Sequence, residues 1–174
     1  MAVEYMEYYT YEDYKKWEGD WELIYGMPYA FSPFSLHSHQ KISGKILVQL
    51  DRILENCKNC YALMESEVKF SSDTTVRPDV IVKCGEIDDI TITPEIIFEV
   101  ISMGSIKRDE LLKFNLYKQE GILYYGIVYP DDKRAKVYKL INGEYIKIAD
   151  LRNETFKTDD LDCNVKVNFS KVWL

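Results

Sequence analysis

The fold is decided by two short apolar runs, Arg77-Pro78-Asp79-Val80-Ile81-Val82 and Pro94-Glu95-Ile96-Ile97-Phe98-Glu99-Val100-Ile101. Each run is rich in β-branched residues and is bounded by polar turns, a pattern that predicts a buried strand. Asp79 opens the first strand, and Glu99 interrupts the second. Carboxylates are rarely buried in a strand unless something pairs with them, and a divalent cation is one such partner.

Neighbouring side chains of a strand point to opposite faces, so Glu99 is expected on the same face as Ile97 and Ile101. A simpler interpretation of the two acids is also open. Asp79 could cap a turn, and Glu99 could lie at an open sheet edge beside a lysine. The remaining sequence has to decide between a metal site and this structural arrangement.

The composition is that of a packed globular protein, with 174 residues of which 47% are hydrophobic. This length suits one domain that spans residues 1–174. No apolar run approaches the roughly 18 residues that a membrane-spanning helix needs, and the acidic, aromatic residues 1–10 do not resemble a signal peptide. We therefore expect a cytoplasmic protein without a membrane partner.

The four cysteines are expected to be reduced thiols. Cys57-Lys58-Asn59-Cys60 is a CxxC pair, but zinc sites usually need a second ligand pair nearby in the pattern, and none appears. We therefore expect no zinc at this pair. The net charge of −7 does not favour tight attraction to a phosphate backbone, although a local basic groove can coexist with an acidic remainder.

Helical and strand patterns alternate along the rest of the chain. The predicted elements are a short helix from Thr10 to Trp17 with a capping box formed by Thr10 and Asp13, two strands turning at Gly26, a long helix over 39–55, a strand over 62–70, the strands of Asp79 and Glu99, a helix from Ile106 capped by Ser105, a strand over 124–129 and a hairpin at Asn142-Gly143. This order indicates an α/β sandwich around a mixed sheet.

Several short motifs follow one another along this framework. They are Tyr11-x-Asp13-Tyr14, Glu22-Leu23-Ile24-x-Gly26, Ser32-Pro33, His39-Gln40-x-Ile42-Ser43-Gly44, Pro78-Asp79-Val80, Glu99-Val100-Ile101-Ser102, Asp109-x-x-x-Lys113, Tyr117, Gly121 and Tyr125-x-Ile127-Val128. As an ordered set over residues 8 to 140, they closely resemble the Uma2 family of the PD-(D/E)XK nuclease superfamily. The resemblance implies a restriction-endonuclease-like mixed β-sheet flanked by helices.

The resemblance also implies a role for each candidate residue. Asp79 and Glu99 match the acids that bind a divalent metal, Mg²⁺ or Mn²⁺, and Glu22 matches a further catalytic acid. Ile101 stands where the superfamily's lysine is usual, and Lys113 on the following helix takes that role, with Lys107 as the alternative. The expected substrate-binding residues are His39, Lys107 and Arg108.

The predicted activity is therefore metal-dependent hydrolysis of phosphodiester bonds by a homodimeric endodeoxyribonuclease, with DNA as its partner. Lys113 could instead be a surface partner of Asp109, which precedes it by one helical turn. The alternative function is that of a catalytically weak or inactive nuclease-fold domain that binds nucleic acid or another protein. Gly126 departs from the family pattern, which usually has an aromatic residue there, but this change removes no proposed ligand.

Overall fold

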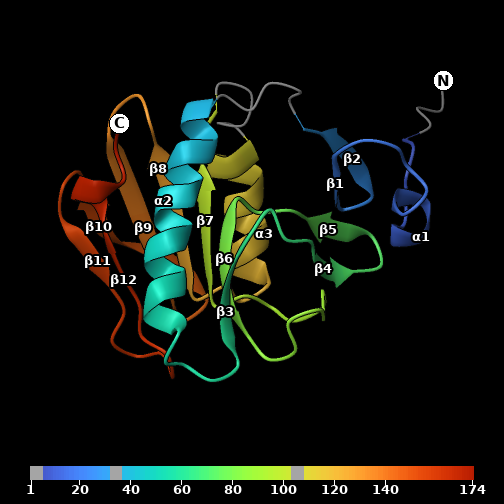
Figure 1. Ribbon diagram of the computed structural model, residues 1–174. Helices are drawn as coiled ribbons and strands as arrows, with labels where there is room; N and C mark the ends of the chain where they lie inside the picture. Colours follow the sequence, from blue (N-terminus) through green and yellow to red (C-terminus); the bar gives the residue numbers. More distant parts are fainter. Residues whose placement is uncertain (1–5, 32–36, 103–107) are drawn as a thin grey trace.

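The computed structural model describes residues 6–31, 37–102 and 108–174 (Figure 1). Its centre is a six-stranded sheet in the order β10-β9-β8-β7-β6-β3. The strands are β3 (Cys60–Met64), β6 (Val80–Cys84), β7 (Ile96–Val100), β8 (Tyr124–Tyr129), β9 (Arg134–Ile141) and β10 (Glu144–Leu151). β7 and β8 are parallel and the other neighbours are antiparallel, which confirms the predicted mixed sheet.

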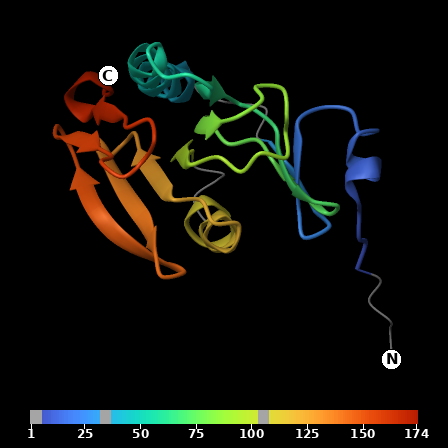
Figure 2. The same cartoon turned by 90° about the horizontal axis from the view of Figure 1, so that it is seen from below.

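Helices cover both faces of this sheet (Figure 2). α2 (His37–Leu54) packs on one face through its buried apolar stripe, Ile42, Ile46, Leu50 and Leu54. A π-helical turn, η1 (Arg108–Leu112), leads into α3 (Lys113–Gln119) on the other face. The predicted cap Ser105 and the predicted helix start at Ile106 lie outside the described residues.

β7 separates two hydrophobic cores. Phe98 belongs to the core under α2, whereas Ile97 and Ile101 belong to the core under α3. The strand therefore alternates as its sequence predicts, and this alternation turns Glu99 towards α3. In the core under α2, the Phe98 ring packs edge-on against Phe156.

A smaller second sheet lies beside α3, in the order β2-β1-β5-β4. Its strands are β1 (Trp21–Ile24), β2 (Met27–Ala30), β4 (Val68–Ser71) and β5 (Thr74–Val76). The short helix α1 (Tyr11–Tyr14) precedes them, and the capping box of Thr10 and Asp13 that the sequence predicts is present. Ile24, Val68 and Val76 join this sheet to the core under α3.

The prediction of one strand over residues 62–70 is wrong. β3 ends at Met64, and the chain passes from the large sheet into the second sheet as β4. Glu65 makes the break with a φ of 50°, and its N–H donates to the carbonyl of Asp79 at 3.1 Å. The apolar alternation continues through both strands, so the pattern does not mark where the chain changes sheets.

The C-terminal segment completes the face that α2 covers. It contains β11 (Thr155–Lys157), β12 (Lys166–Asn168) and the 3-10 turn η2 (Phe169–Lys171). The predicted hairpin between β9 and β10 is confirmed, and it turns at Asn142 and Gly143 with φ values of 51° and 81°. Among the described helices, none is long and apolar enough to cross a membrane.

The cysteines are paired in the structure. Cys57 is bonded to Cys163, and Cys60 is bonded to Cys84. The expectation of four reduced thiols is therefore wrong for this state of the protein. Spacing along the chain could not reveal the pairing, because the bonded residues are 106 and 24 positions apart.

Candidate active site

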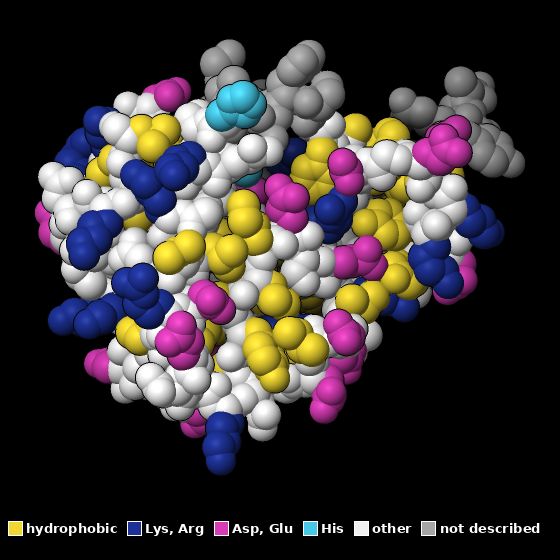
Figure 3. Space-filling model, in the orientation of Figure 1, with side chains coloured by type: hydrophobic (Ala, Val, Ile, Leu, Met, Phe, Trp, Pro, Cys, Tyr) yellow, Lys and Arg dark blue, Asp and Glu magenta, His cyan; other side chains and the backbone are white. Residues whose placement is uncertain are grey.

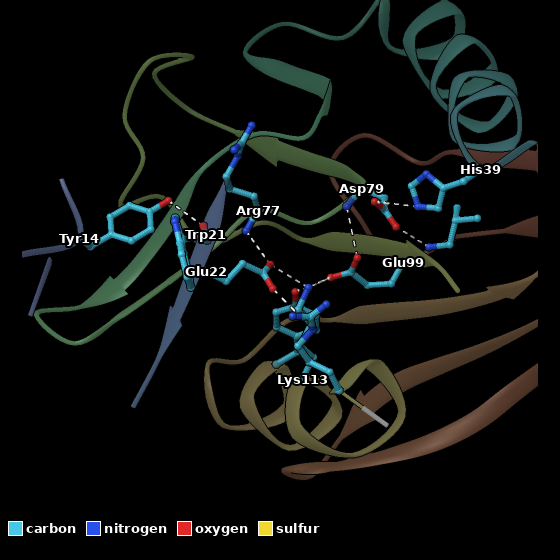
Figure 4. Close-up of polar contacts among 11 residues, drawn as sticks. Tyr14, Trp21, Glu22, His39, Arg77, Asp79, Glu99 and Lys113 are labelled. Carbon is cyan, nitrogen blue, oxygen red and sulfur yellow. Dashed lines mark hydrogen bonds and ion pairs between the residues drawn. The ribbon is translucent and has the colours of Figure 1, made fainter. Parts of the chain in front are cut away.

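Asp79 is the residue directly before β6, and its carboxylate lies against the neighbouring strand β7 (Figure 4). Asp79 Oδ2 accepts the N–H of Val100 at 2.6 Å. The N–H of Asp79 in turn donates to Glu99 Oε2 at 3.3 Å. The two acids of the central motif are thus held together by reciprocal contacts between adjacent strands.

Glu99 is almost completely buried, with 3% of its surface exposed. Its Oε1 accepts hydrogen bonds from Lys113 Nζ at 2.7 Å and from the Tyr117 hydroxyl at 2.8 Å. Lys113 and Tyr117 are one helical turn apart in α3 and therefore reach the same carboxylate. Burial, together with the negative charge of Glu99, raises the pKa of Tyr117 well above its ordinary value, so this hydroxyl is a neutral donor.

Glu22 approaches the same ammonium from the second sheet. Its side chain is fully buried in β1, and Glu22 Oε1 lies 2.8 Å from Lys113 Nζ. The same oxygen accepts the backbone N–H of Arg77 at 2.9 Å. Lys113, only 2% exposed, therefore bridges carboxylates from the two sheets. The Lys113 ammonium lies in the interior and not at the surface, and the side chain of Asp109 lies outside what the structure describes.

Glu22 Oε2 and the side chain of Arg108 border a region that we call the polar gap. Glu22 Oε2 is buried and has no hydrogen-bond partner among the described residues, and the same holds for Arg108 Nε. These two atoms are 3.9 Å apart, and the Arg108 guanidinium lies over the Tyr29 ring at 5.9 Å. Because buried polar atoms are almost always satisfied, the pair points to a water, ion or anionic group between or beside them.

His39 reaches Asp79 from α2 on the other side of the site. Its Nε2 lies 3.2 Å from Asp79 Oδ1. Burial lowers the pKa of His39, but the hydrogen bond to Asp79 and the negative charges of Asp79 and Glu65 outweigh burial, so the pKa is raised overall. The raised pKa means that the Asp79 carboxylate favours the cationic form of the imidazole.

Comparisons with known proteins identify the family and the fold. The sequence profile of the Uma2 family, described as "Putative restriction endonuclease", matches residues 7–165. The chain belongs to the Uma2 family. No curated protein matches it. A crystal structure described as a putative nuclease belonging to DUF820, from Anabaena variabilis, shares its fold with a TM-score of 0.76 at 16% identity, over 94% of this chain and 97% of that one.

This Uma2 chain brings together nearly all the residues that its sequence singles out. Glu22, His39, Asp79, Glu99, Arg108 and Lys113 converge on one region, to which both sheets, α2, η1 and α3 contribute. Lys107 lies outside the described residues. Tyr117 was not predicted from the sequence as a partner of Glu99, although its position one turn after Lys113 is the signal that could have revealed it.

The oxygen-rich site of this Uma2 chain fits a hard divalent cation. Mg²⁺ and Mn²⁺ prefer carboxylate oxygens, and the site offers three acids, Glu22, Asp79 and Glu99. The unsatisfied Glu22 Oε2 is the observation that most directly favours an additional ligand or its water shell here. Joint binding of a cation by Asp79 and Glu99 stays a prediction.

Proposed function

We propose that this Uma2 protein is a divalent-metal-dependent endodeoxyribonuclease that hydrolyses phosphodiester bonds. The observation that carries the proposal is the buried ammonium of Lys113, which contacts Glu22 and Glu99 while Asp79 is hydrogen-bonded to the same glutamate. Glu22, Glu99 and Lys113 are buried beside the partly buried Asp79, and burying so many charges in one place is costly for a purely structural core. Clusters of buried ionisable groups of this kind are candidate functional sites.

Asp79 and Glu99 are the residues that we expect to hold Mg²⁺ or Mn²⁺. They lie on adjacent strands and already share a hydrogen bond through the Asp79 N–H. A cation bound there would polarise the scissile phosphate and neutralise part of its charge. When the cation binds, His39 would release Asp79 Oδ1, which its Nε2 contacts at 3.2 Å, and would turn towards the substrate.

The protein's own groups would do the remaining work. In hydrolysis, a water oxygen forms a bond to phosphorus while the bond from phosphorus to the leaving ester oxygen breaks. The positive Lys113 ammonium would stabilise the negative charge that develops on the phosphate oxygens. Glu22 Oε2, which lacks a hydrogen-bond partner among the described residues, is available to accept a proton of the attacking water.

Binding of DNA would depend on local charge, because the whole chain has a net charge of −7. Arg108 is a positively charged residue beside the polar gap, and its Nε has no hydrogen-bond partner among the described residues. Elsewhere, Lys and Arg side chains gather on the side of the molecule that carries β10 to β12 (Figure 3). We therefore propose that Arg108 contacts the phosphate nearest to the reacting bond.

The deciding experiment is cleavage of a DNA panel of supercoiled, linear duplex and single-stranded forms with Mg²⁺, Mn²⁺ or EDTA. We expect cleavage that requires the metal and is lost in Glu99→Gln. Glu95→Gln is the matched control, because Glu95 lies directly before β7, at the other end of that strand, outside the site. If no DNA form is cleaved with either ion and calorimetry finds no metal binding that depends on Asp79, the binding-domain alternative replaces the enzyme.

A further inference from the structure

All four cysteines of the chain meet at one end of the large sheet. Cys57 follows α2, Cys60 begins β3, Cys84 ends β6, and Cys163 lies between β11 and β12. The sulfur atoms of Cys57, Cys60 and Cys163 all lie within 4.8 Å of one another. Cys84 is bonded to Cys60, its direct partner across β3 and β6.

We propose that, in the reduced protein, these four cysteines bind one Zn²⁺ ion as a structural site. Zinc takes four thiolates in a tetrahedron with Zn–S distances of about 2.3 Å, which places neighbouring sulfurs about 3.8 Å apart. The three clustered sulfurs lie within 4.8 Å of one another, and reduction of the bond between Cys57 and Cys163 would allow these two sulfurs to move apart to this spacing. Cys84 lies outside this group of three, and its sulfur, once released from Cys60 by reduction, would turn towards the same centre.

Spacing along the chain does not reveal this set of four cysteines, because no second ligand pair lies close to Cys57 and Cys60 in the sequence. The fold supplies that pair from distant segments, because β6 runs antiparallel to β3 and brings Cys84 opposite Cys60. The C-terminal segment then brings in Cys163, 106 positions after Cys57.

The backbone holds the CxxC turn in place independently of the sulfur chemistry. The N–H of Cys57 donates to the carbonyl of Leu54 at 2.8 Å, at the end of α2. Asn59 has a φ of 64°, and its carbonyl accepts the N–H of Gly85 at 2.7 Å. The turn of the CxxC pair is therefore tied directly to the turn that follows Cys84. Such preorganisation lowers the cost of gathering the ligands.

The cysteine cluster is separate from the acidic site. β6 begins next to Asp79 and ends at Cys84, so the two sites lie at opposite ends of a five-residue strand. At 3.3 Å per residue, this separation is about 17 Å. Figure 1 shows the end of α2, the start of β3 and the end of β6 together at the lower end of the sheet. Four protein ligands leave no open coordination position, which is typical of a structural zinc.

The zinc form and the disulfide form are related by a balanced exchange. Two molecules of a dithiol reductant supply four electrons and four protons, which break both disulfides and yield four thiols. Binding of one Zn²⁺ then releases the four protons as the thiols become thiolates. In the opposite direction, two molecules of the oxidised dithiol accept four electrons from the thiolates and four protons from solution, which restores the bonds of Cys57 to Cys163 and Cys60 to Cys84 and expels the metal.

The test uses the full chain, purified anaerobically with a reductant and supplied with Zn²⁺. We expect a content of one zinc ion per chain, as measured by elemental mass spectrometry. Replacement by Co²⁺ should give the absorption bands of a tetrahedral thiolate site. Cys84→Ser and Cys163→Ser should each lose the tightly bound ion, whereas Cys84→His should keep it with a shifted cobalt spectrum, because a Cys₃His set also binds zinc. Asp79→Asn is the control and should retain the zinc.

Two results would overturn the proposal. One is a reduced protein that takes up no stoichiometric Zn²⁺, and the other is zinc binding that is unchanged in Cys84→Ser or Cys163→Ser. If the serine variants do not fold, Co²⁺ titration of the metal-stripped, reduced wild-type protein decides the matter. Absence of the sulfur-to-cobalt charge-transfer band there would exclude the site.

Discussion

The Lys113 ammonium lies 2.7 Å from Oε1 of Glu99, and both side chains are almost completely shielded from water. Removing one partner of a buried ion pair leaves the other charge uncompensated, which usually costs about 3–5 kcal/mol. Here the cost concerns two acids, because the same ammonium also contacts Glu22. The stability of the site therefore depends on the lysine to which we also assign a role in the proposed chemistry.

Lys113→Met should reduce DNA cleavage by about 10² or more, the scale seen when one preorganised electrostatic group is deleted. It should also lower the free energy of unfolding by about 3–5 kcal/mol without metal, as measured by urea denaturation. The control is Lys83→Met, since Lys83 is equally buried but donates to the backbone carbonyl of Asp89 at 2.7 Å. Equal cleavage by the two variants would contradict the role of Lys113.

Asp79→Asn and Asp79→Ala should both abolish metal-dependent cleavage, but they should differ in stability. The Val100 N–H donates to Asp79 Oδ2 at 2.6 Å, and an asparagine oxygen can still accept it. Alanine leaves that N–H unsatisfied, which costs about 1–3 kcal/mol. Thermal or urea unfolding in EDTA measures the difference, and identical stabilities would show that the Val100 contact contributes nothing.

Tyr117→Phe should leave the fold intact but weaken the position of Glu99. The ring still packs against Tyr125, while the hydrogen bond of 2.8 Å to the carboxylate is lost. Hydrogen bonds to charged groups contribute about 1.5–3 kcal/mol. Tyr145→Phe is the control, because its buried hydroxyl donates to the neutral carbonyl of Ile122. Cleavage rates should fall only in Tyr117→Phe, and a similar fall in both variants would argue against a positioning role.

Glu95→Gln should stabilise the protein at neutral pH but not in acid. Burial, aided by the negative charge of Asp162, raises the pKa of Glu95 above its ordinary value of 4.5. A carboxyl group whose pKa is raised in the folded state makes the protein less stable as the pH rises through that pKa. The advantage of Glu95→Gln should therefore vanish below pH 4.5.

Glu154→Gln should show the opposite dependence of stability on pH when both variants are denatured at a series of pH values. The backbone N–H of Arg152, with other backbone donors, lowers the pKa of Glu154. This variant should be less stable than the wild type at neutral pH, and the difference should disappear in acid. If both variants respond to pH in the same direction, the environments of the two carboxyl groups have been misassigned.

The strand pattern allowed much of this architecture to be predicted from the sequence. The alternation around Glu99 correctly placed this acid opposite Phe98, and the stripe from Ile42 to Leu54 correctly placed α2. The hydrogen bond from the Val100 N–H to the Asp79 carboxylate could not be predicted in this way, because it depends on the pairing of β6 with β7.

Other features depend on tertiary contacts that spacing does not encode. The rotation of α3 decides whether Lys113 faces solvent or Glu99, and packing on the sheet sets that rotation. Gly126 departs from the family pattern because the Phe98 ring fills the space above it, where an added Cβ would meet the ring at 2.3 Å. The homodimer, the single domain over residues 1–174 and the cytoplasmic location stay predictions, the first of which light scattering would test.

Glu65, where the chain leaves the large sheet, also divides the site into two parts that form at different stages of folding. Asp79 and Glu99 belong to adjacent strands and can associate early, whereas Glu22 arrives only when the second sheet docks beside α3. Contacts between segments that are distant in sequence form late, because closing long loops costs entropy. A chain whose second sheet has not yet docked would therefore hold Asp79 and Glu99 together without Glu22, and the proposed active site would be completed only at a late step of folding.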